Sequence, residues 1–260
     1  MHIKKSSHSH YIKWRIQRPE RFNALGTNIG SELLKSIQDL EKTLQDSKEI
    51  RMLAICAESV KSRRGLFWIA GGDLKELSKL KDKRQAFDYG QCYQDIIKGL
   101  RKLPIPVVFG IHGQAIGGGV ELCLGGDLRI ATEASSFHFK QTAVGLATGY
   151  GGSTFLKELV GLSKASSWLF QNKTLEAAEA LSEGLIHDLC KDETKLDEKL
   201  DALAEHFSQQ SPEGLAAQKA MLNQISPEME HNLRKELEEF TKIWRNPHHE
   251  IFLKPFVGKD

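Results

Sequence analysis

The sequence predicts an α/β fold with crossover connections, followed by a helical C-terminal region. Over roughly the first 195 residues, short apolar strand patterns alternate with amphipathic helix patterns. From about Leu196 onward the strand patterns vanish and charged helical segments follow one another. The 260 residues are enough to bury a sizeable core. We therefore expect a core domain over residues 1–195 and a helical region over 196–260.

The first half of the chain contains alternating strand and helix patterns. Residues 11–16 place Ile12, Trp14 and Ile16 on one side, which predicts a half-buried strand. Asp73 follows two glycines and is expected to cap a short helix that begins at Leu74. The other expected elements are a loop over 18–25, strands over 51–57 and 66–70, and helices over about 29–44 and 87–100.

The second half continues the alternation and then becomes helical. Strands are expected over 107–111, 127–132 and 137–139, and a helix over 154–160. Ser211-Pro212 and Ser226-Pro227 are each expected to start a helix, with proline at the first helical position. We expect the last helix over about 228–244, where apolar residues recur every three or four positions. Either the core or a second subunit must cover that apolar stripe.

Composition excludes several classes of protein. The 36 Lys and Arg nearly balance the 34 Asp and Glu, so the net charge of +2 gives no bulk reason to expect nucleic acid or an anionic membrane as a partner. No apolar stretch approaches the ~18 residues of a membrane helix, and no signal peptide is evident. The four cysteines are widely spaced, which predicts buried free thiols. We expect a soluble cytoplasmic protein.

The segment with the strongest chemical signal is Val107–Glu121. An apolar strand pattern is followed by the triple glycine Gly117–Gly119, and Glu121 lies one turn inside the next helix. The first N–H groups of such a helix lack partners and favour negative charge. The apolar neighbours of Glu121 predict a desolvated carboxyl with a raised pKa, as suits a general acid or base. Together these features indicate enolate chemistry.

A second glycine turn, Gly71-Gly72, follows another buried strand pattern. Its N–H groups and those of the triple glycine could converge on one oxygen, although the turn alone reads as a plain strand-to-helix connection. A third glycine turn, over 149–153, follows a segment in which His138 and Gln141 are the polar groups. We expect His138 to be a hydrogen-bonded core residue. His248-His249-Glu250 hints at a metal, but a surface turn is expected there instead.

Five motifs, in this order, resemble those of the enoyl-CoA hydratase/isomerase (crotonase) family. They are R-P-E-R-F-N-A-L at 18–25, the segments 67–76 and 113–127, 144–153 with Thr148 in place of the usual proline, and 181–186. The resemblance covers nearly the whole chain. It implies a spiral of repeated β-β-α units over 1–195 and a helical trimerisation region over 196–260, with a homotrimer or a dimer of trimers as the assembly.

The resemblance also implies the ligand and the site. The ligand is an acyl-CoA thioester, as in fatty acid metabolism, with coenzyme A as part of the substrate and no metal or tightly bound cofactor. The thioester carbonyl is expected between the N–H groups of Gly72 and Gly118, and Glu121 falls on the first catalytic glutamate. The residues expected at the coenzyme A site are Arg21, near a phosphate, and Ala24, Ala70, Asp73, Leu74 and Lys75.

One position departs from the family pattern. Gln141 stands where hydratases of this family carry their second glutamate, and an amide does not transfer a proton as a carboxyl group does. Hydration of a 2-enoyl-CoA with Glu121 as the sole acid/base is the first hypothesis. Decarboxylation or isomerisation of an acyl-CoA through the same enolate is the alternative. A non-catalytic acyl-CoA-binding protein is the third.

Overall fold

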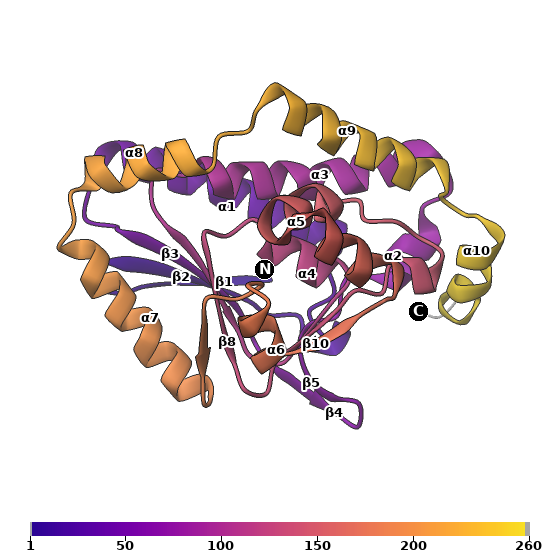
Figure 1. Cartoon of the computed structure of the whole chain (residues 1–260), viewed down its shortest axis with the longest axis horizontal. Coiled ribbons are helices and arrows are strands. Elements are labelled where there is room, and N and C mark those ends of the chain that lie inside the picture. Colours follow the sequence, from indigo (N-terminus) through magenta and orange to yellow (C-terminus); the bar gives the residue numbers. More distant parts are fainter. Residues whose placement is uncertain (1, 258–260) are drawn as a thin grey trace.

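The computed structural model describes residues 2–257 and consists of two β-sheets wrapped by helices (Figure 1). The larger sheet has the order β1 (Ile3–Ser7), β2 (Tyr11–Ile16), β3 (Met52–Ala57), β6 (Val107–Ile111), β8 (Leu128–Thr132) and β11 (Asp188–Cys190). The smaller sheet has the order β10 (Thr174–Glu176), β9 (Ser136–His138), β7 (Gln114–Ile116), β5 (Gly65–Ile69) and β4 (Val60–Ser62).

The chain winds as a spiral of β-β-α turns, which confirms the expected fold. Each turn places one strand in each sheet and then a helix: β3, β5 and α3 (Lys83–Lys102); β6, β7 and α4 (Gly118–Cys123); β8, β9 and α5 (Gly152–Phe170). The strands β3, β6 and β8 pair in parallel, as do β5, β7 and β9. Because the second strands of successive turns are parallel neighbours, the connections that follow them meet at one edge of the smaller sheet.

The main core lies between the sheets and the long helices α1 (Thr27–Asp46) and α3. One face of α1 buries Ile29, Leu33, Ile37 and Leu40 at intervals of three and four residues, as the sequence predicts. Burying a side chain of this size stabilises the fold by about 1.5–3 kcal/mol. The short elements that complete this part are α2 (Leu74–Lys79), α6 (Ala177–Ser182), η1 (Pro19–Arg21) and η2 (Thr142–Val144).

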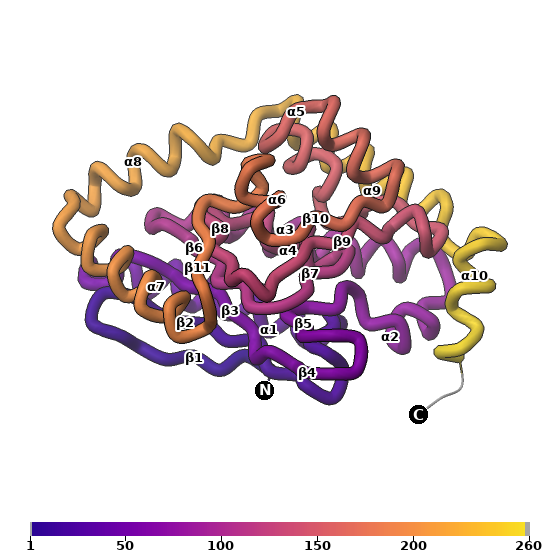
Figure 2. The backbone as a smooth tube through the Cα atoms, turned by 60° about the horizontal axis from the view of Figure 1, so that its bottom comes forward, coloured from indigo at the N-terminus to yellow at the C-terminus, as the bar shows by residue number. Residues whose placement is uncertain are grey.

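Strand β2 is buried or partly buried on both faces, so the expectation of a half-buried strand at 11–16 is wrong. Helix α7 (Glu193–Ser208) lies beside the larger sheet in both views (Figures 1 and 2) and packs on β3, β6 and β8. The hydroxyl of Tyr11 donates to Asp201 at 2.6 Å, and the Lys13 ammonium bonds to Asp197 at 2.7 Å. A helix about 180 residues further along supplies these partners, which the local alternation does not reveal.

Five strands were not anticipated from the sequence: β1, β4, β7, β10 and β11. They are three to five residues long, and most of their side chains are polar or only partly buried. Strands this short are stabilised mainly by pairing with a neighbouring strand, as when Leu175 of β10 pairs with Phe137 of β9. Their pattern in the sequence is therefore weak.

The C-terminal region forms α7, α8 (Pro212–Leu222), α9 (Pro227–Lys242), α10 (Pro247–Leu253) and η3 (Lys254–Phe256). Ser211 and Ser226 cap α8 and α9 as predicted, each accepting the backbone N–H of the residue three positions further along. The apolar stripe of α9 packs on α3 and α5 of the same chain (Figure 1). The core therefore covers it. The division at residue 195 stays a prediction.

Two expectations about the end of the chain are wrong. The segment over 228–244 is not the last helix, because α10 follows it. His248 and His249 belong to that helix rather than to a surface turn, and His249 is fully buried against the Trp244 ring. Asn246 caps the helix by accepting the N–H groups of both histidines, so the polar residues before Pro247 start a helix.

The remaining expectations concern cysteines, membranes and metals. All four cysteines are free thiols, three of them buried, as expected. Among residues 2–257, no helix is long and apolar enough to cross a bilayer. The same residues contain no group of three or more His, Cys, Asp or Glu side chains placed to hold a metal ion.

Candidate active site

Two glycine turns lie side by side where β5 and β7 end. Gly71 and Gly117 both have positive φ, at 91° and 50°, in the region that favours glycine. A Cβ added to Gly71 would lie 2.8 Å from the carbonyl oxygen of Ile116 and 3.6 Å from the nitrogen of Gly118. The close approach of the two turns therefore excludes a side chain at residue 71.

The N–H groups that follow these turns are free. Gly72 lies between β5 and α2, and Gly118 is the first residue of α4, so its N–H has no acceptor within the helix. Among residues 2–257, no acceptor for either N–H is found. Two unpaired backbone donors beside one cavity are a preorganised site for negative charge.

A cavity of about 170 Å³ brings the four expected catalytic residues together. Gly72, Gly118, Glu121 and Gln141 all line it, although they come from three different segments. The rest of the lining is mostly small, aliphatic or aromatic, and comprises Ala70, Gly71, Leu74, Leu77, Tyr89, Ile116, Gly117, Lys140, Val144, Leu146, Ala147, Gly149, Tyr150, Phe240 and Phe252.

The two carboxylate oxygens of Glu121 have different surroundings. Oε2 accepts the N–H groups of Gly149, Tyr150 and Gly152 at 3.1, 2.9 and 3.2 Å. Oε1 accepts a single hydrogen bond, from Nε2 of Gln141 at 2.9 Å. The side chain is only 4% exposed. The turn over 149–152 therefore fixes one oxygen and leaves lone-pair capacity on the other.

Burial raises the pKa of Glu121 to about 7. The negative charge of Glu236 contributes to this increase, and the hydrogen bonds from Gln141, Tyr150 and Gly149 oppose it. Near neutral pH this carboxyl is present in both protonation states. The pKa thus matches what a group needs to take up and return a proton.

Sequence reasoning missed Glu236, which α9 places on the opposite side of the same turn. Its carboxylate accepts the N–H groups of Gly151 and Thr154, both at 3.0 Å, and the Thr154 hydroxyl at 2.9 Å. Burial raises the pKa of Glu236 as well. In the sequence it is one of many glutamates on α9, so no local signal marks it.

Gln141 has one polar atom without a partner. Its Nε2 donates to Glu121, but its buried Oε1 has no hydrogen-bond partner among the described residues. An unsatisfied buried oxygen costs free energy unless a donor such as water or substrate reaches it. The amide can therefore accept a hydrogen bond within the cavity while it holds Glu121.

Two tyrosines that the sequence did not single out, Tyr89 and Tyr150, line the cavity, and a third, Tyr93, packs against Tyr150. Tyr150 stacks on Tyr93 with ring centroids 4.4 Å apart, and its hydroxyl bonds to that of Tyr89. Tyr89 in turn donates to the carbonyl of Leu25 at 2.7 Å. The Tyr150 ring covers Gly118 so closely that a Cβ there would lie 2.5 Å from it. The cluster leaves room only for the glycine backbone.

The residues expected at the coenzyme A site separate into two groups. Ala70 and Leu74 line the cavity, whereas Arg21, Ala24, Asp73 and Lys75 do not. The Asp73 carboxylate is already engaged: it caps α2 through the N–H groups of residues 75 and 76 and forms an ion pair with Arg18 at 2.7 Å. These contacts join Arg18, in the loop over 18–25, to the first turn of α2.

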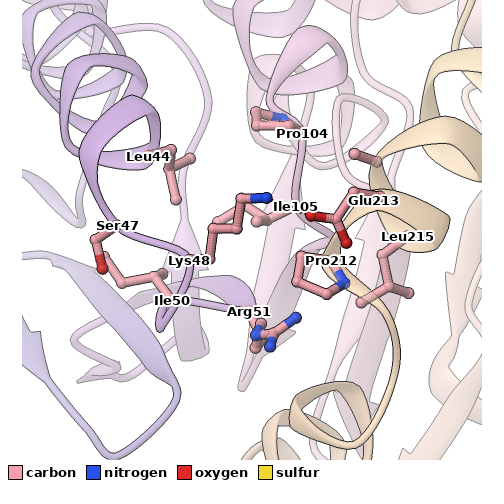
Figure 3. Close-up of a pocket in the computed structure, with 11 residues that line it drawn as sticks. Leu44, Ser47, Lys48, Ile50, Arg51, Pro104, Ile105, Pro212, Glu213 and Leu215 are labelled. Atoms are coloured by element: carbon pink, nitrogen blue, oxygen red, sulfur yellow. Dashed lines mark hydrogen bonds and ion pairs between the residues drawn. The ribbon is translucent and has the colours of Figure 1, made fainter.

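A second pocket, of about 150 Å³, lies between the end of α1 and the start of α8 (Figure 3). Figure 3 shows Lys48 reaching towards Glu213, with which it forms an ion pair. Arg51 donates to the carbonyl of Gln210. The charged groups of this pocket thus have partners, and no free backbone donors meet a buried carboxyl there, so we place the chemistry in the first cavity.

Residues 8–259 match the sequence model of the enoyl-CoA hydratase/isomerase family. The chain is 31% identical over 195 residues to a probable enoyl-CoA hydratase of Bacillus subtilis (strain 168), covering 75% of this chain and 72% of that relative. It is 30% identical over 212 residues to the mitochondrial methylglutaconyl-CoA hydratase of Mus musculus, covering 80% and 64%. The enoyl-CoA hydratase structure from Bacillus halodurans matches the fold with a TM-score of 0.87 at 21% identity, covering 98% of this chain and all of that one.

Proposed function

The chain belongs to the enoyl-CoA hydratase/isomerase family and is an enzyme of the crotonase type, and on that premise we propose that it adds water to a 2-enoyl-CoA, or removes it in reverse. The observation that supports this proposal is the buried carboxyl of Glu121 in the same cavity as the unpaired N–H groups of Gly72 and Gly118. A proton carrier and two oxyanion donors are the groups that this reaction requires.

The oxyanion donors act on the thioester oxygen. As the water oxygen bonds to C3, the C2–C3 π electrons move towards the thioester and its oxygen becomes negative. The N–H groups of Gly72 and Gly118 then stabilise the enolate more strongly than the neutral carbonyl, which lowers the barrier. Backbone donors fixed by two glycine turns need no reorganisation during the step.

Glu121 moves the proton. Its Oε1 takes the proton of the attacking water, because Oε2 is held by three N–H groups. The same carboxyl then gives that proton to C2, which completes the addition and restores the carboxylate. Oε1 of Gln141 accepts the other O–H of the water and orients it, in keeping with its lack of a protein partner.

A second candidate reaction is favoured by Gln141, the amide at the position of the second glutamate. Decarboxylation of a malonyl-type acyl-CoA forms the same thioester enolate without a second carboxyl. The carbon–carbon bond to the carboxylate breaks, carbon dioxide leaves, and the electron pair enters the enolate. Isomerisation of the double bond is the weaker alternative. It moves a proton between two carbons, and residue 141 is an amide in place of the second carboxyl group.

The test is turnover of trans-2-enoyl-CoA substrates of increasing chain length, followed by loss of the enoyl-thioester absorbance. We expect Glu121→Gln to lower kcat by about 10² to 10⁴-fold while it still binds the thioester. Full activity of that variant would show that Glu121 is not the proton carrier. Absence of turnover on every enoyl-CoA, with turnover of a malonyl-type thioester, would replace hydration by decarboxylation.

We also propose that residues 196–260 form an oligomerisation region and that the enzyme is a homotrimer or a dimer of trimers. In support, two helices of this region expose large apolar side chains, Met221 and Leu222 of α8 and Ile251 of α10, as does α5 of the core with Leu162 and Phe170. The mass in solution, measured by light scattering, tests this. A cytoplasmic location remains a proposal, supported by the four free thiols.

For coenzyme A, we propose that it enters as part of the substrate and lies along Ala24, Ala70 and the start of α2, with Arg21 near a phosphate. The Arg21 guanidinium has no hydrogen bond or ion pair with any residue from 2 to 257, so it is available to an anion. Lys75, in the first turn of α2, is partly exposed. Weaker binding of free coenzyme A by Arg21→Met would support this placement.

A further inference from the structure

Lys140 is the one basic side chain in the lining of the catalytic cavity, as far as residues 2–257 define it. It lies directly before Gln141, in the connection between β9 and η2. Glu121 is the one acidic side chain in the same lining. Most of the other lining groups are glycine, aliphatic or aromatic, so a single ammonium group stands in a largely apolar wall.

The ammonium group of Lys140 lacks a carboxylate partner. Its Nζ makes one hydrogen bond, at 3.3 Å, to the backbone carbonyl of Asn172. No ion pair of Lys140 is found among the described residues. By contrast, the buried ammonium of Lys219 has an ion pair with Asp127 at 2.8 Å and bonds to two backbone carbonyls. Lys13, which is also buried, is likewise paired with an aspartate.

We propose that the acyl group of the substrate carries a free carboxylate and that Lys140 binds it. The proposal rests on the function given above, which places the reacting carbons beside Glu121 and Gln141. Because Lys140 and Gln141 are consecutive residues of the same lining, we place the acyl part of the thioester within reach of the ammonium group. The substrate class is then the coenzyme A thioester of a dicarboxylic acid.

The chemistry of lysine suits this role. An ammonium group has three donors, so Lys140 keeps its bond to Asn172 while it donates to a carboxylate. A charge-assisted hydrogen bond in a largely apolar cavity discriminates between a charged and a neutral acyl group by about tenfold or more. The positive charge also offsets the repulsion that Glu121 exerts on an acidic acyl chain.

The experiment compares the affinities of saturated thioesters in pairs of equal length. Glutaryl-CoA is paired with pentanoyl-CoA, and adipoyl-CoA with hexanoyl-CoA, so that a carboxylate replaces a methyl group. Neither pair has a C2–C3 double bond, so hydration cannot occur and calorimetry measures recognition alone. We expect the full-length enzyme to bind at least one carboxylated thioester about tenfold more tightly than its neutral partner.

Substitutions assign the preference to one side chain. Lys140→Met should abolish the preference and leave the affinity for the neutral thioesters and for free coenzyme A unchanged, whereas Lys140→Arg should retain part of it. Lys191→Met, which removes an exposed lysine outside the cavity, is the control for net charge. An equal loss of affinity for free coenzyme A in Lys140→Met would mean that Lys140 binds a phosphate, and would overturn the proposal.

The outcomes separate this inference from the proposed function. Equal binding of both members of every pair, with turnover of neutral enoyl-CoA, would refute the carboxylate site alone. A preference that persists in Lys140→Met would refute it as well. If no thioester binds, with or without a carboxylate, the acyl-CoA function itself fails.

Discussion

Glu121 and Glu236 accept hydrogen bonds from interleaved N–H groups of one turn. Residues 149, 150 and 152 donate to Glu121, whereas residues 151 and 154 donate to Glu236. The two carboxylates come from α4 and α9, more than 100 residues apart in the chain. The turn at the start of α5 therefore holds two acidic groups close together, and each disfavours the ionised form of the other.

Replacing Glu236 should shift the pH dependence of the reaction. The charge of Glu236 raises the pKa of Glu121, so Glu236→Gln lowers it. Since Glu121 acts as a base when ionised, activity should fall as pH drops through its pKa of about 7, and this fall should move to lower pH in the variant. The measurement is kcat/KM from pH 5 to 9.

The matched control for that experiment is Glu239→Gln. Glu239 lies on the same helix, is exposed and pairs with Lys242. Its replacement changes the net charge equally but leaves the turn untouched, so its pH profile should follow the wild type. Identical profiles for Glu236→Gln and the wild type would mean that the two carboxyls are not coupled.

Gly118→Ala should reduce kcat by about 10² to 10³-fold, the usual loss for one oxyanion donor. The added Cβ would lie 2.5 Å from the Tyr150 ring, so either the ring or the N–H of residue 118 must move. Turnover and thermal unfolding are measured together. The double variant Gly118→Ala, Tyr150→Ala removes the clash. If it regains full stability and activity, the loss in the single variant comes from the clash with the ring. It then does not come from a change in the N–H donor of residue 118.

Gln141→Glu should change the shape of the pH profile. A second carboxyl beside Glu121 lets one group act ionised and the other protonated, so kcat/KM should pass through a maximum and fall again at high pH. Gln141→Met is the comparison: it removes the donor that lowers the pKa of Glu121, so the acid limb should move to higher pH. A Glu variant with the wild-type profile would contradict a role for residue 141 beside the proton carrier.

Asp73→Ala should destabilise the loop and helix that border the cavity. Asp73 caps α2 and pairs with Arg18, whose side chain is 13% exposed. Loss of a cap alone costs about 1 kcal/mol, and removing the shortest of the ion pairs that Arg18 forms with Asp73, Glu76 and Glu20 adds to it. Asp82→Ala, at the exposed cap of α3, is the control and should cost only the first amount. Equal unfolding free energies for the two variants would show that the ion pair between Asp73 and Arg18 does not contribute to stability.

Several features were predictable because their causes are local. The helix starts at Asp73, Ser211 and Ser226 follow from side chains that bind N–H groups two or three residues ahead. The expected strand after Pro106 matches β6 at both ends, because a short apolar run rich in β-branched residues and bounded by proline and glycine fits few other structures. The pattern of a buried strand, a glycine turn and a helix led to Glu121 and the two glycine turns in the same way.

Local patterns in the sequence predicted the long helices, the longer strands and the glycine turns that line the cavity, and the family resemblance implied the β-β-α spiral. Which distant groups meet the glycine turns depends on how the whole chain folds. Glu236, the tyrosine cluster and the helix over Lys13 act across more than 60 residues of chain, and no periodic pattern encodes such a pairing. The pKa of Glu121 depends on those neighbours, because desolvation and nearby charge are properties of a folded environment and not of a residue.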